Sequence, residues 1–344
     1  MTAVDTTSRR AMIAGLSAVA GLSVGGCLGD AGQRLTLGVG PVDSRSHRAG
    51  RALAVAADRH SETLRLTTTE IDGRTERLYA LDRGTVDAAG LDNTTLYRAA
   101  EGVGAFAAEP VESLPHQGFG YGWRDHYWLA TSDIESTAAL VNVDDAGAGD
   151  AGVSNASVNE TSAGDASAVY PGQPGRPGRL VTEQLLRAAG RWETLPVDNR
   201  PREVVAAAVD RGEIGAVAVV ETDGRLADWC RRLDETAGDR LAAVPIGEAF
   251  AGVIDAASNA MATAVAPTGW SGASLPEQVD GWRVASQWLF DPAVDGAAVA
   301  ELRALAREHA DLVDAPAAAE AAVAGAVMPS LPVHEGVADA VEGA

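Results

Sequence analysis

Short apolar stretches alternate with amphipathic stretches along most of the chain. Apolar runs bounded by turn residues predict strands, and apolar residues spaced three or four apart predict helices. The strands are expected at 35–39, 64–67, 86–91, 127–130, 214–220, 241–245 and 261–265. The helices are expected at 48–59, 75–81, 94–100, 180–189, 202–209, 277–290, 299–309 and 316–327. Strands that alternate with helices predict an α/β protein with mostly parallel sheets.

One segment, residues 144–168, interrupts this alternation because it consists almost entirely of Asp, Gly, Ala, Ser and Asn. Such a composition cannot bury an apolar face, so we expect a polar flexible insert on the surface. The insert contains two N-x-[ST] sequons, at Asn155 and Asn159. In an exported protein these asparagines are candidate glycosylation sites.

The N-terminal region has the layout of an export signal. Arg9 and Arg10 precede an uncharged run rich in Ala, Gly and Ser, which ends in VGGC at Cys27. The run is marginal for a membrane span, whereas a charged start and a short apolar centre are typical of secretory signals. The arginine pair resembles a twin-arginine signal, and VGGC resembles a lipobox, at which the cysteine receives lipid. We therefore expect a twin-arginine-type lipoprotein signal at 1–26 and a tether at 27–34.

Cys27 would then hold the exported protein by its lipid on the extracellular face of the cell membrane, since two or more acyl chains suffice for stable anchoring. A signal that is uncleaved, or that does not use the cysteine, is the alternative.

The chain is strongly acidic, with 48 Asp and Glu residues, 27 basic residues that are all arginine, and a net charge of -21. Its hydrophobic content of 46% is enough for a packed core, so the charge predicts a hydrated acidic surface rather than disorder. Few aromatic residues and abundant Ala, Gly and Asp resemble the composition of extreme halophiles, which suggests a halophilic archaeon. A surface this acidic repels phosphate backbones, so nucleic acid is excluded as a partner.

Motifs that would indicate catalysis or metal binding are few. Cys230 is the only cysteine besides Cys27, which leaves no thiolate metal cluster, and we expect it to be a small core residue. The sequence has no complete dinucleotide loop, no phosphate-binding G-x-x-x-x-G-K-[ST] loop, no zinc helix and no nucleophile elbow. We therefore expect no cofactor, no metal site and no catalytic residue, and the protein is not expected to be an enzyme.

A strand, a short polar or glycine-rich turn and a helix follow one another three times. In α/β sheets ligands bind beyond the carboxyl ends of strands, where helix N-termini offer free N–H groups to a small anion such as a carboxylate. The candidate ligand-binding residues are Gly40, Pro41, Ser44, Arg45, Ser46, His47, Asp92, Asn93, Thr94, Arg176, Gly178, Arg179 and Glu221. Arginines could add bidentate contacts, although most arginines here would serve solubility. For His47, helix capping or exposure is an equal alternative.

Five segments in order carry a family resemblance: LTLGVGPVDSRSHRAGRAL, RLYALDRGTVDAAGLDNTTLYRAAEG, PGQPGRPGRLVTEQLLRAAG, VVAAAVDRGEIGAVAVV and LPVHEGVADAVE. Together they resemble the TAXI family of solute receptors, the substrate-binding subunits of one type of TRAP transporter. The chain departs from the family pattern in the first loop, where Ser46 and His47 replace paired tyrosines. It departs again where Arg176, Pro177 and Gly178 replace a Ser-Gly-Thr triplet.

The resemblance implies a two-lobed, type II periplasmic-binding-protein-like fold, in which each lobe is a mostly parallel sheet flanked by helices. We place the first lobe at 35–122 and 262–344 and the second lobe at 123–261, with crossing strands near 127–130 and 261–265 as the hinge. The resemblance also implies a monomeric receptor that captures a small solute, an organic acid or amino acid, and delivers it to a TRAP-type membrane permease. An exported enzyme on the same scaffold and a ligand sensor without a transport role are the alternatives.

Overall fold

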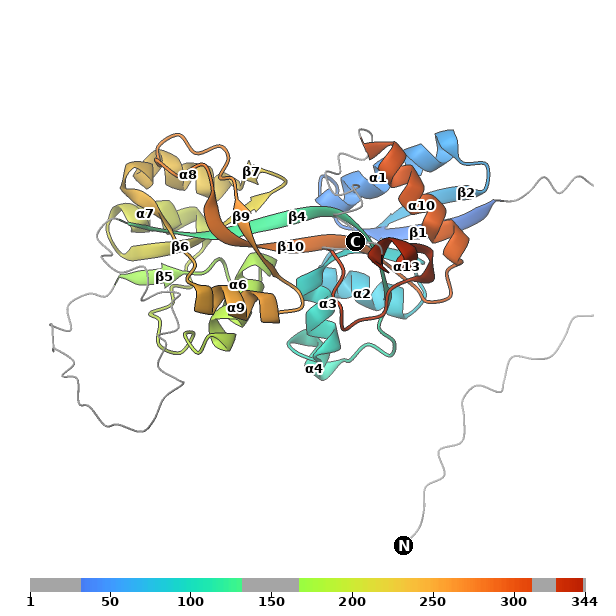
Figure 1. The fold of residues 1–344 in the computed structure, drawn as a ribbon, viewed down its shortest axis with the longest axis horizontal. Helices are drawn as coiled ribbons and strands as arrows, with labels where there is room; N and C mark the ends of the chain where they lie inside the picture. The colour runs from blue at the N-terminus through green and yellow to red at the C-terminus, as the bar shows by residue number, and fades with distance from the viewer. Residues whose placement is uncertain (1–31, 132–166, 311–325, 343–344) are drawn as a thin grey trace, which may run out of the picture. The chain divides into compact units, whose positions relative to one another are not determined.

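The secondary structure follows the expected alternation over most of the chain (Figure 1). This computed structural model describes residues 32–131, 167–310 and 326–342. The strands are β1 (Gln33–Val39), β2 (Leu64–Glu70), β3 (Ala88–Asp92), β4 (His116–Thr131), β5 (Ala168–Tyr170), β6 (Ile214–Thr222), β7 (Arg225–Leu226), β8 (Leu241–Val244), β9 (Met261–Val265) and β10 (Val279–Phe290). The α-helices are α1 (Arg45–His60), α2 (Arg74–Asp82), α3 (Asn93–Ala100), α4 (Ala105–Ala108), α6 (Pro177–Ala188), α7 (Val205–Asp210), α8 (Asp228–Ala237), α9 (Glu248–Ala256), α10 (Gly296–Glu308) and α13 (Glu335–Glu342). Two short 3-10 helices are η1 (Arg202–Val204) and η2 (Gly238–Arg240).

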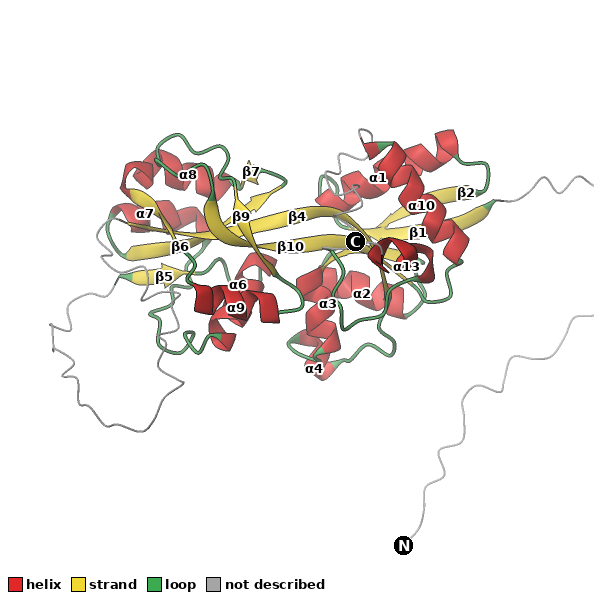
Figure 2. Ribbon diagram, viewed as in Figure 1, coloured by secondary structure: helices red, strands yellow, loops and turns green. Residues whose placement is uncertain are grey.

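The strands form one mixed sheet in the order β2-β1-β3-β10-β4-β6-β5 (Figure 2). β7 pairs with β6, β8 with β4, and β9 with β10. β1 is parallel to both β2 and β3, and β5 is parallel to β6, whereas β4 and β10 run antiparallel to each other and to all their neighbours. β4 and β10 are the longest strands, and they run from the first lobe into the second (Figure 1).

Each lobe has an apolar core on both faces of its part of the sheet. In the first lobe, α1 and α10 cover one face and α2 and α3 the other. In the second lobe, α7 and α8 cover one face and α6 and α9 the other. The crossing strands supply both cores by alternation: Tyr127 of β4 faces the α7–α8 side and Trp128 faces the α6–α9 side.

The predicted fold class, a two-lobed type II periplasmic-binding-protein-like α/β fold, is confirmed by this sheet and its two crossing strands. The expectation of mostly parallel pairing holds for β1–β3 in the first lobe. It is wrong for the second lobe, where β5–β6 is parallel but β6 pairs antiparallel with β4 and β7. The chain enters this lobe along β4, so β6 is laid against a strand of opposite direction.

The helix predicted at 277–290 is wrong, because this segment forms β10, one of the two crossing strands. The second crossing strand is therefore not at 261–265, which instead forms β9 and pairs with β10. Seven consecutive residues at the end of β10 are buried, so neither face shows the polar alternation that identifies a strand. Trp282 and Trp288 consequently lie on a strand, not on a helix.

The predicted boundary between the lobes near residue 261 does not agree with the packing of the cores. Val265, Ala273 and Val279 pack into the same core as Tyr127, although the sequence analysis assigned residues after 261 to the first lobe. The remaining boundaries stay a prediction. The helix predicted at 316–327 lies outside the described residues except for its end, where Ala326 lies in a turn. Of the helices that the structure describes, none combines the length and apolar character needed to cross a membrane.

A buried amide network fixes the first-lobe ends of the crossing strands. Gln117 of β4 accepts a hydrogen bond from Met328 N (2.7 Å) and donates to Met328 O (3.0 Å) and Leu331 O (3.1 Å). Gln287 of β10 donates to Gln117 Oε1 (3.1 Å) and to Ala326 O (3.2 Å). The segment from Ala326 to Leu331 is thereby held against both strands.

We expect Gln117→Leu to lower the free energy of unfolding by roughly 2–4 kcal/mol, because it leaves the buried Met328 N–H and the carbonyls without partners. Denaturant unfolding in high salt measures this change. Gln33→Leu is the control, since Gln33 is exposed on β1, and its effect should stay within about 0.5 kcal/mol. Equal effects of the two substitutions would contradict the importance of the network.

Candidate functional site

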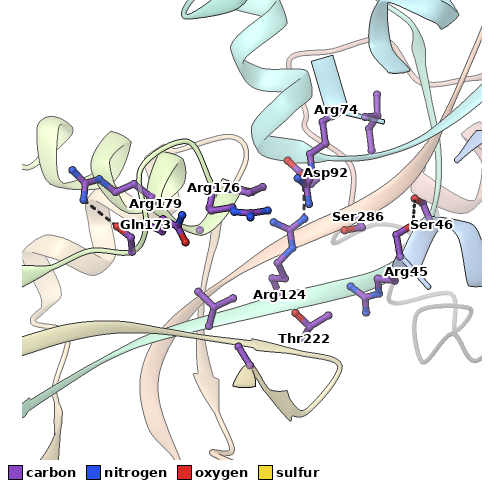
Figure 3. Close-up of a pocket in the computed structure, with 18 of the residues that line it drawn as sticks. Arg45, Ser46, Arg74, Asp92, Arg124, Gln173, Arg176, Arg179, Thr222 and Ser286 are labelled. Carbon is purple, nitrogen blue, oxygen red and sulfur yellow. Dashed lines mark hydrogen bonds and ion pairs between the residues drawn. The ribbon is translucent and has the colours of Figure 1, made fainter. Parts of the chain in front are cut away.

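A cavity of about 570 Å³ opens where the loops of both lobes meet (Figure 3). The first lobe contributes the loop before α1, the start of α2 and the end of β3, and the second lobe contributes the loop before α6 and the end of β6. The crossing strands add Tyr121 and Arg124 from β4 and Ser286 from β10. Because most of these segments follow the carboxyl end of a strand, the cavity occupies the position at which α/β sheets bind ligands.

The N-terminal ends of α1, α2, α3, α6 and α8 all border this cavity. Ser44 caps α1 by accepting a hydrogen bond from His47 N (3.2 Å), and Asp92 caps α3 by accepting one from Thr95 N (3.0 Å). Helix N-termini carry partial positive charge and unsatisfied N–H groups. The backbone therefore contributes a positive potential before any side chain is considered.

The charged side chains that line the cavity are predominantly cationic. The arginines are Arg45, Arg74, Arg77, Arg124, Arg176, Arg179 and Arg202, and the carboxylates are Asp72 and Asp92. This excess of positive charge lies in a protein with a net charge of -21. The cavity is thus an electropositive hollow in an otherwise acidic molecule, and it suits an anion.

Asp92 is the centre of the charged cluster. One oxygen, Oδ2, forms an ion pair with Arg74 Nε (2.6 Å) and accepts a hydrogen bond from Arg124 Nη2 (2.9 Å), while Oδ1 caps α3. Burial alone would raise the pKa of Asp92, but Arg124 and Arg74 outweigh burial and hold the pKa well below its usual range. Each arginine contacts Asp92 through one nitrogen only. The other guanidinium nitrogens of Arg74 and Arg124 have no hydrogen-bond partner among the described residues.

Arg77 lines the first-lobe side of the cavity, and Gly40 lies directly behind it. Arg77 is buried, donates from Nη1 to Ile71 O (3.0 Å), and has no partner for Nε in the described part of the chain. Burial lowers the pKa of Arg77. A Cβ on Gly40 would lie 2.8 Å from Arg77 Nη1 and 2.7 Å from Ser44 Oγ, so a glycine is required for this close approach.

Arg176 and Arg179 have different environments in the second-lobe wall. Arg179 is buried, donates to Gly172 O (3.1 Å) and Asn199 Oδ1 (2.8 Å), and stacks on Trp192 at 4.6 Å. It therefore shapes the loop before α6. Arg176 is exposed and makes no ion pair with the described residues. Its side chain points toward Arg124 and Asp92 (Figure 3).

His126 lies behind this wall and does not line the cavity. It stacks on Trp282 at 5.3 Å, and a Cβ on Gly178 would lie 3.3 Å from its Cε1. Burial and the nearby Arg124 lower the pKa of His126 to about 3, so the ring is neutral. The described residues contain no group of three or more His, Cys, Asp or Glu side chains placed to hold a metal ion.

Eight of the thirteen candidate ligand-binding residues line the cavity: Pro41, Ser44, Arg45, Ser46, Asp92, Arg176, Gly178 and Arg179. That they bind ligand stays a prediction. His47 does not line the cavity, and its backbone N–H donates to Ser44 Oγ, so Ser44 and not His47 is the capping residue of α1. Gly40 lies behind the wall, where it makes room for Arg77.

Asn93, Thr94 and Glu221 lie away from the cavity. Asn93 faces the first-lobe core, where it donates to Ala326 O (2.8 Å) and accepts from Gln287 (2.7 Å), and Thr94 is buried beside it. Glu221 accepts from Tyr127 Oη (2.5 Å) and Thr268 Oγ1 (2.9 Å). The position of Glu221 follows from strand alternation, since the adjacent Thr222 of β6 faces the cavity, whereas Asn93 is the first residue of α3 and lies on the side of this helix that packs on the first lobe.

The lining residues that sequence reasoning missed are mainly Arg74, Arg77, Tyr121, Arg124, Tyr170, Gln173 and Thr222. Arg74 and Arg77 follow a strand and open a helix, so the pattern used for the other turns could have found them. Arg124 gave no such signal, because it lies within a long strand. Cys27, Asn155 and Asn159 lie outside the described residues, as does the insert at 144–168 up to residue 166. Ala168 already begins β5.

No family model matches this chain, and no curated protein matches it either. Among solved structures, it is similar to a TctC solute binding protein from Polaromonas, with 16% identity, 82% of this chain and 85% of that chain covered, and a TM-score of 0.43. It is similar to the periplasmic aliphatic sulphonate binding protein SsuA from Escherichia coli, with 13% identity, 82% and 76% covered, and a TM-score of 0.38.

A third similar structure is a TRAP periplasmic solute binding protein from Pseudomonas aeruginosa with bound L-malate. Its identity to this chain is 9%, the match covers 82% of this chain and 84% of that chain, and the TM-score is 0.34. Likenesses of this size leave the family of this chain unassigned.

We expect Asp92→Asn to lower the free energy of unfolding by roughly 3 kcal/mol at neutral pH, because it removes the charge between Arg74 and Arg124 but keeps the capping oxygen. The pKa of Asp92 is depressed in the folded protein, so its charge stabilises the fold above the unfolded pKa and less as the pH falls. The difference between wild type and variant should therefore shrink below pH of about 4. Unfolding titrations at several pH values measure it.

Asp72→Asn is the matched control, because Asp72 lines the same cavity but is exposed and makes no ion pair with the described residues. Its effect should stay within about 0.5 kcal/mol. A pH-independent difference for Asp92→Asn would contradict the electrostatic role.

Proposed function

We propose that this protein is an extracytoplasmic receptor that binds a small carboxylate-bearing solute between its two lobes. The observation that carries the proposal is the cavity, where seven arginines outnumber two carboxylates in a molecule that is otherwise strongly acidic. A volume of about 570 Å³ is suited to a small organic acid.

The free donors of the cavity come from both lobes. Arg74 and Arg124 each keep nitrogens beyond those used on Asp92, and Arg176 reaches toward them from the other wall (Figure 3). Guanidinium groups that face one another repel, so their approach is unfavourable without a counter-ion. A carboxylate held among them would replace this repulsion with charge-assisted hydrogen bonds to both lobes and would favour the closed state.

We propose that the solute is bound without chemical change. The carboxylate of Asp92 is occupied by two arginines, and burial raises the pKa of Tyr170 to about 12 and raises that of Tyr121. None of these groups is suited to accept a proton at neutral pH. The described lining contains no histidine or cysteine that could act as base or nucleophile.

The setting of the receptor rests on the sequence. The twin-arginine-type signal and the lipobox at Cys27 support export and lipid anchoring at the cell surface. The resemblance to TAXI receptors supports delivery of the solute to a TRAP-type permease. An exported enzyme and a ligand sensor without a transport role are the alternatives, and the experiment below separates the receptor from the enzyme.

A thermal-shift screen in high salt tests binding. We expect at least one of succinate, 2-oxoglutarate, L-glutamate and citrate to stabilise the protein, by roughly 2.7 kcal/mol at 100 times its dissociation constant. Uncharged succinamide should give no shift. NMR of the bound acid after prolonged incubation should show it unchanged, whereas turnover would support the enzyme. The absence of any shift with these anions would contradict the proposal.

We expect Arg176→Gln to weaken binding of the acid identified in this screen by about tenfold to a hundredfold, since it removes a charged donor of the second lobe. Its melting temperature without ligand should not fall, because Arg176 is exposed and unpaired among the described residues. Isothermal titration calorimetry measures the affinity. Arg34→Gln, at an exposed position of β1 outside the cavity, should bind like wild type.

A further inference from the structure

The ion pair between Arg45 and Asp223 joins the two lobes beside the cavity. Arg45 is the first residue of α1, which packs on the first-lobe core. Asp223 lies in the turn between β6 and β7 of the second lobe. Arg45 Nη2 and Asp223 Oδ1 form an ion pair without hydrogen-bond geometry, and the two side chains are only 14% and 20% exposed. The ion pair is therefore largely shielded from solvent, and partly buried ion pairs are screened by salt less than exposed ones are.

The path of Arg45 toward the second lobe is built into β4. Nη1 of Arg45 donates to Trp123 O at 2.8 Å. A Cβ on Gly122 would overlap the guanidinium group, so the side chain crosses β4 at a position that only glycine leaves open. The Trp123 carbonyl and the absence of a side chain at Gly122 together direct Arg45 across β4 to the second lobe.

The turn that carries Asp223 is equally defined. Asp223 and Gly224 have φ values of 52° and 66°, and they connect Thr222 and Arg225, which pair with each other. Two consecutive residues with positive φ are the signature of a tight two-residue hairpin turn, for which Asp-Gly is a preferred sequence. The hairpin thus presents the Asp223 carboxylate at a fixed place.

The same pair is coupled to the cavity, because Arg45 and Thr222 line it whereas Asp223 does not. Other charges near Arg45 are Arg48 and Arg124, which oppose its positive charge, and Asp125, which favours it. Burial lowers the pKa of Arg45 to about 10, so the group is still protonated at neutral pH.

From this geometry we propose that Asp223 is a positioning residue that holds Arg45 in the cavity wall and stabilises the closed arrangement of the lobes before any solute binds. The inference rests on the proposed receptor function. When the lobes separate, Asp223 moves away with the second lobe and Arg45 loses its carboxylate partner. The ion pair therefore shifts the equilibrium between open and closed lobes toward the closed state. A bound solute then stabilises the closed state further through its own contacts with both lobes.

Asp223→Asn tests this role. Asparagine also accepts the left-handed conformation, so the hairpin should be retained and only the charge lost. Small-angle X-ray scattering of the ligand-free protein should show a larger radius of gyration for the variant than for wild type. For succinate, or the tighter-binding acid of the screen, the dissociation rate constant should rise about tenfold with little change in association.

Asp43→Asn is the matched control. Asp43 also has a positive φ, of 68°, in a turn before α1, but it does not line the cavity and makes no ion pair with the described residues. It should leave both scattering and kinetics unchanged. An unchanged radius of gyration for Asp223→Asn, or tighter binding of the acid, would overturn the proposal. If no acid binds wild type, the receptor function fails, while the scattering comparison still decides the role of the ion pair.

Discussion

Positive charge gathered around one cavity is the constraint on which this structure depends. Two guanidinium groups about 4 Å apart repel by roughly 4 kcal/mol at a surface-like dielectric, and the helix N-termini add to the same potential. The fold offsets this with Asp92 and with carbonyl oxygens: Ile71 O for Arg77, Trp123 O for Arg45 and Gly172 O for Arg179. These acceptors also fix the arginines in place, so an incoming anion meets donors that are already ordered.

Many of the elements that have one exposed face were predictable from the sequence, although α9 and α13 were not predicted. Strands such as β2, and helices such as α1, show clear periodicity and were placed correctly. β10 was mistaken for a helix because burial on both faces removes the pattern. The first half of β4, with Gly118, Gly120 and Gly122 among buried residues, was missed for the same reason. The strands that join the lobes are thus the ones that hydrophobic patterning reads least well.

The cavity was only partly predictable. Turns after strands identified Ser44, Arg45, Asp92 and Arg176, because the topology brings such turns to one place. The prediction that Glu221 faces the ligand was wrong, because Thr222 faces the cavity instead. The sequence does not show to which side of the sheet each side chain of a strand points. Arg124 could not be found, because its position depends on the pairing of β4 with strands far away in sequence.

The pairing of β4 with β10 is regular from Gly281–Tyr127 to Ser286–Gly122, and its register then shifts between Ser286 and Leu289. Bulges disrupt a ladder locally and bend the bulged strand, so the two crossing strands are least constrained by hydrogen bonds to each other at this irregular stretch. The regular part, from Gly281 to Ser286, is held by an uninterrupted ladder. If the lobes rotate, a bend at the irregular stretch would therefore carry the regular part along with the second lobe, and backbone irregularity in two strands would take the place of a flexible linker.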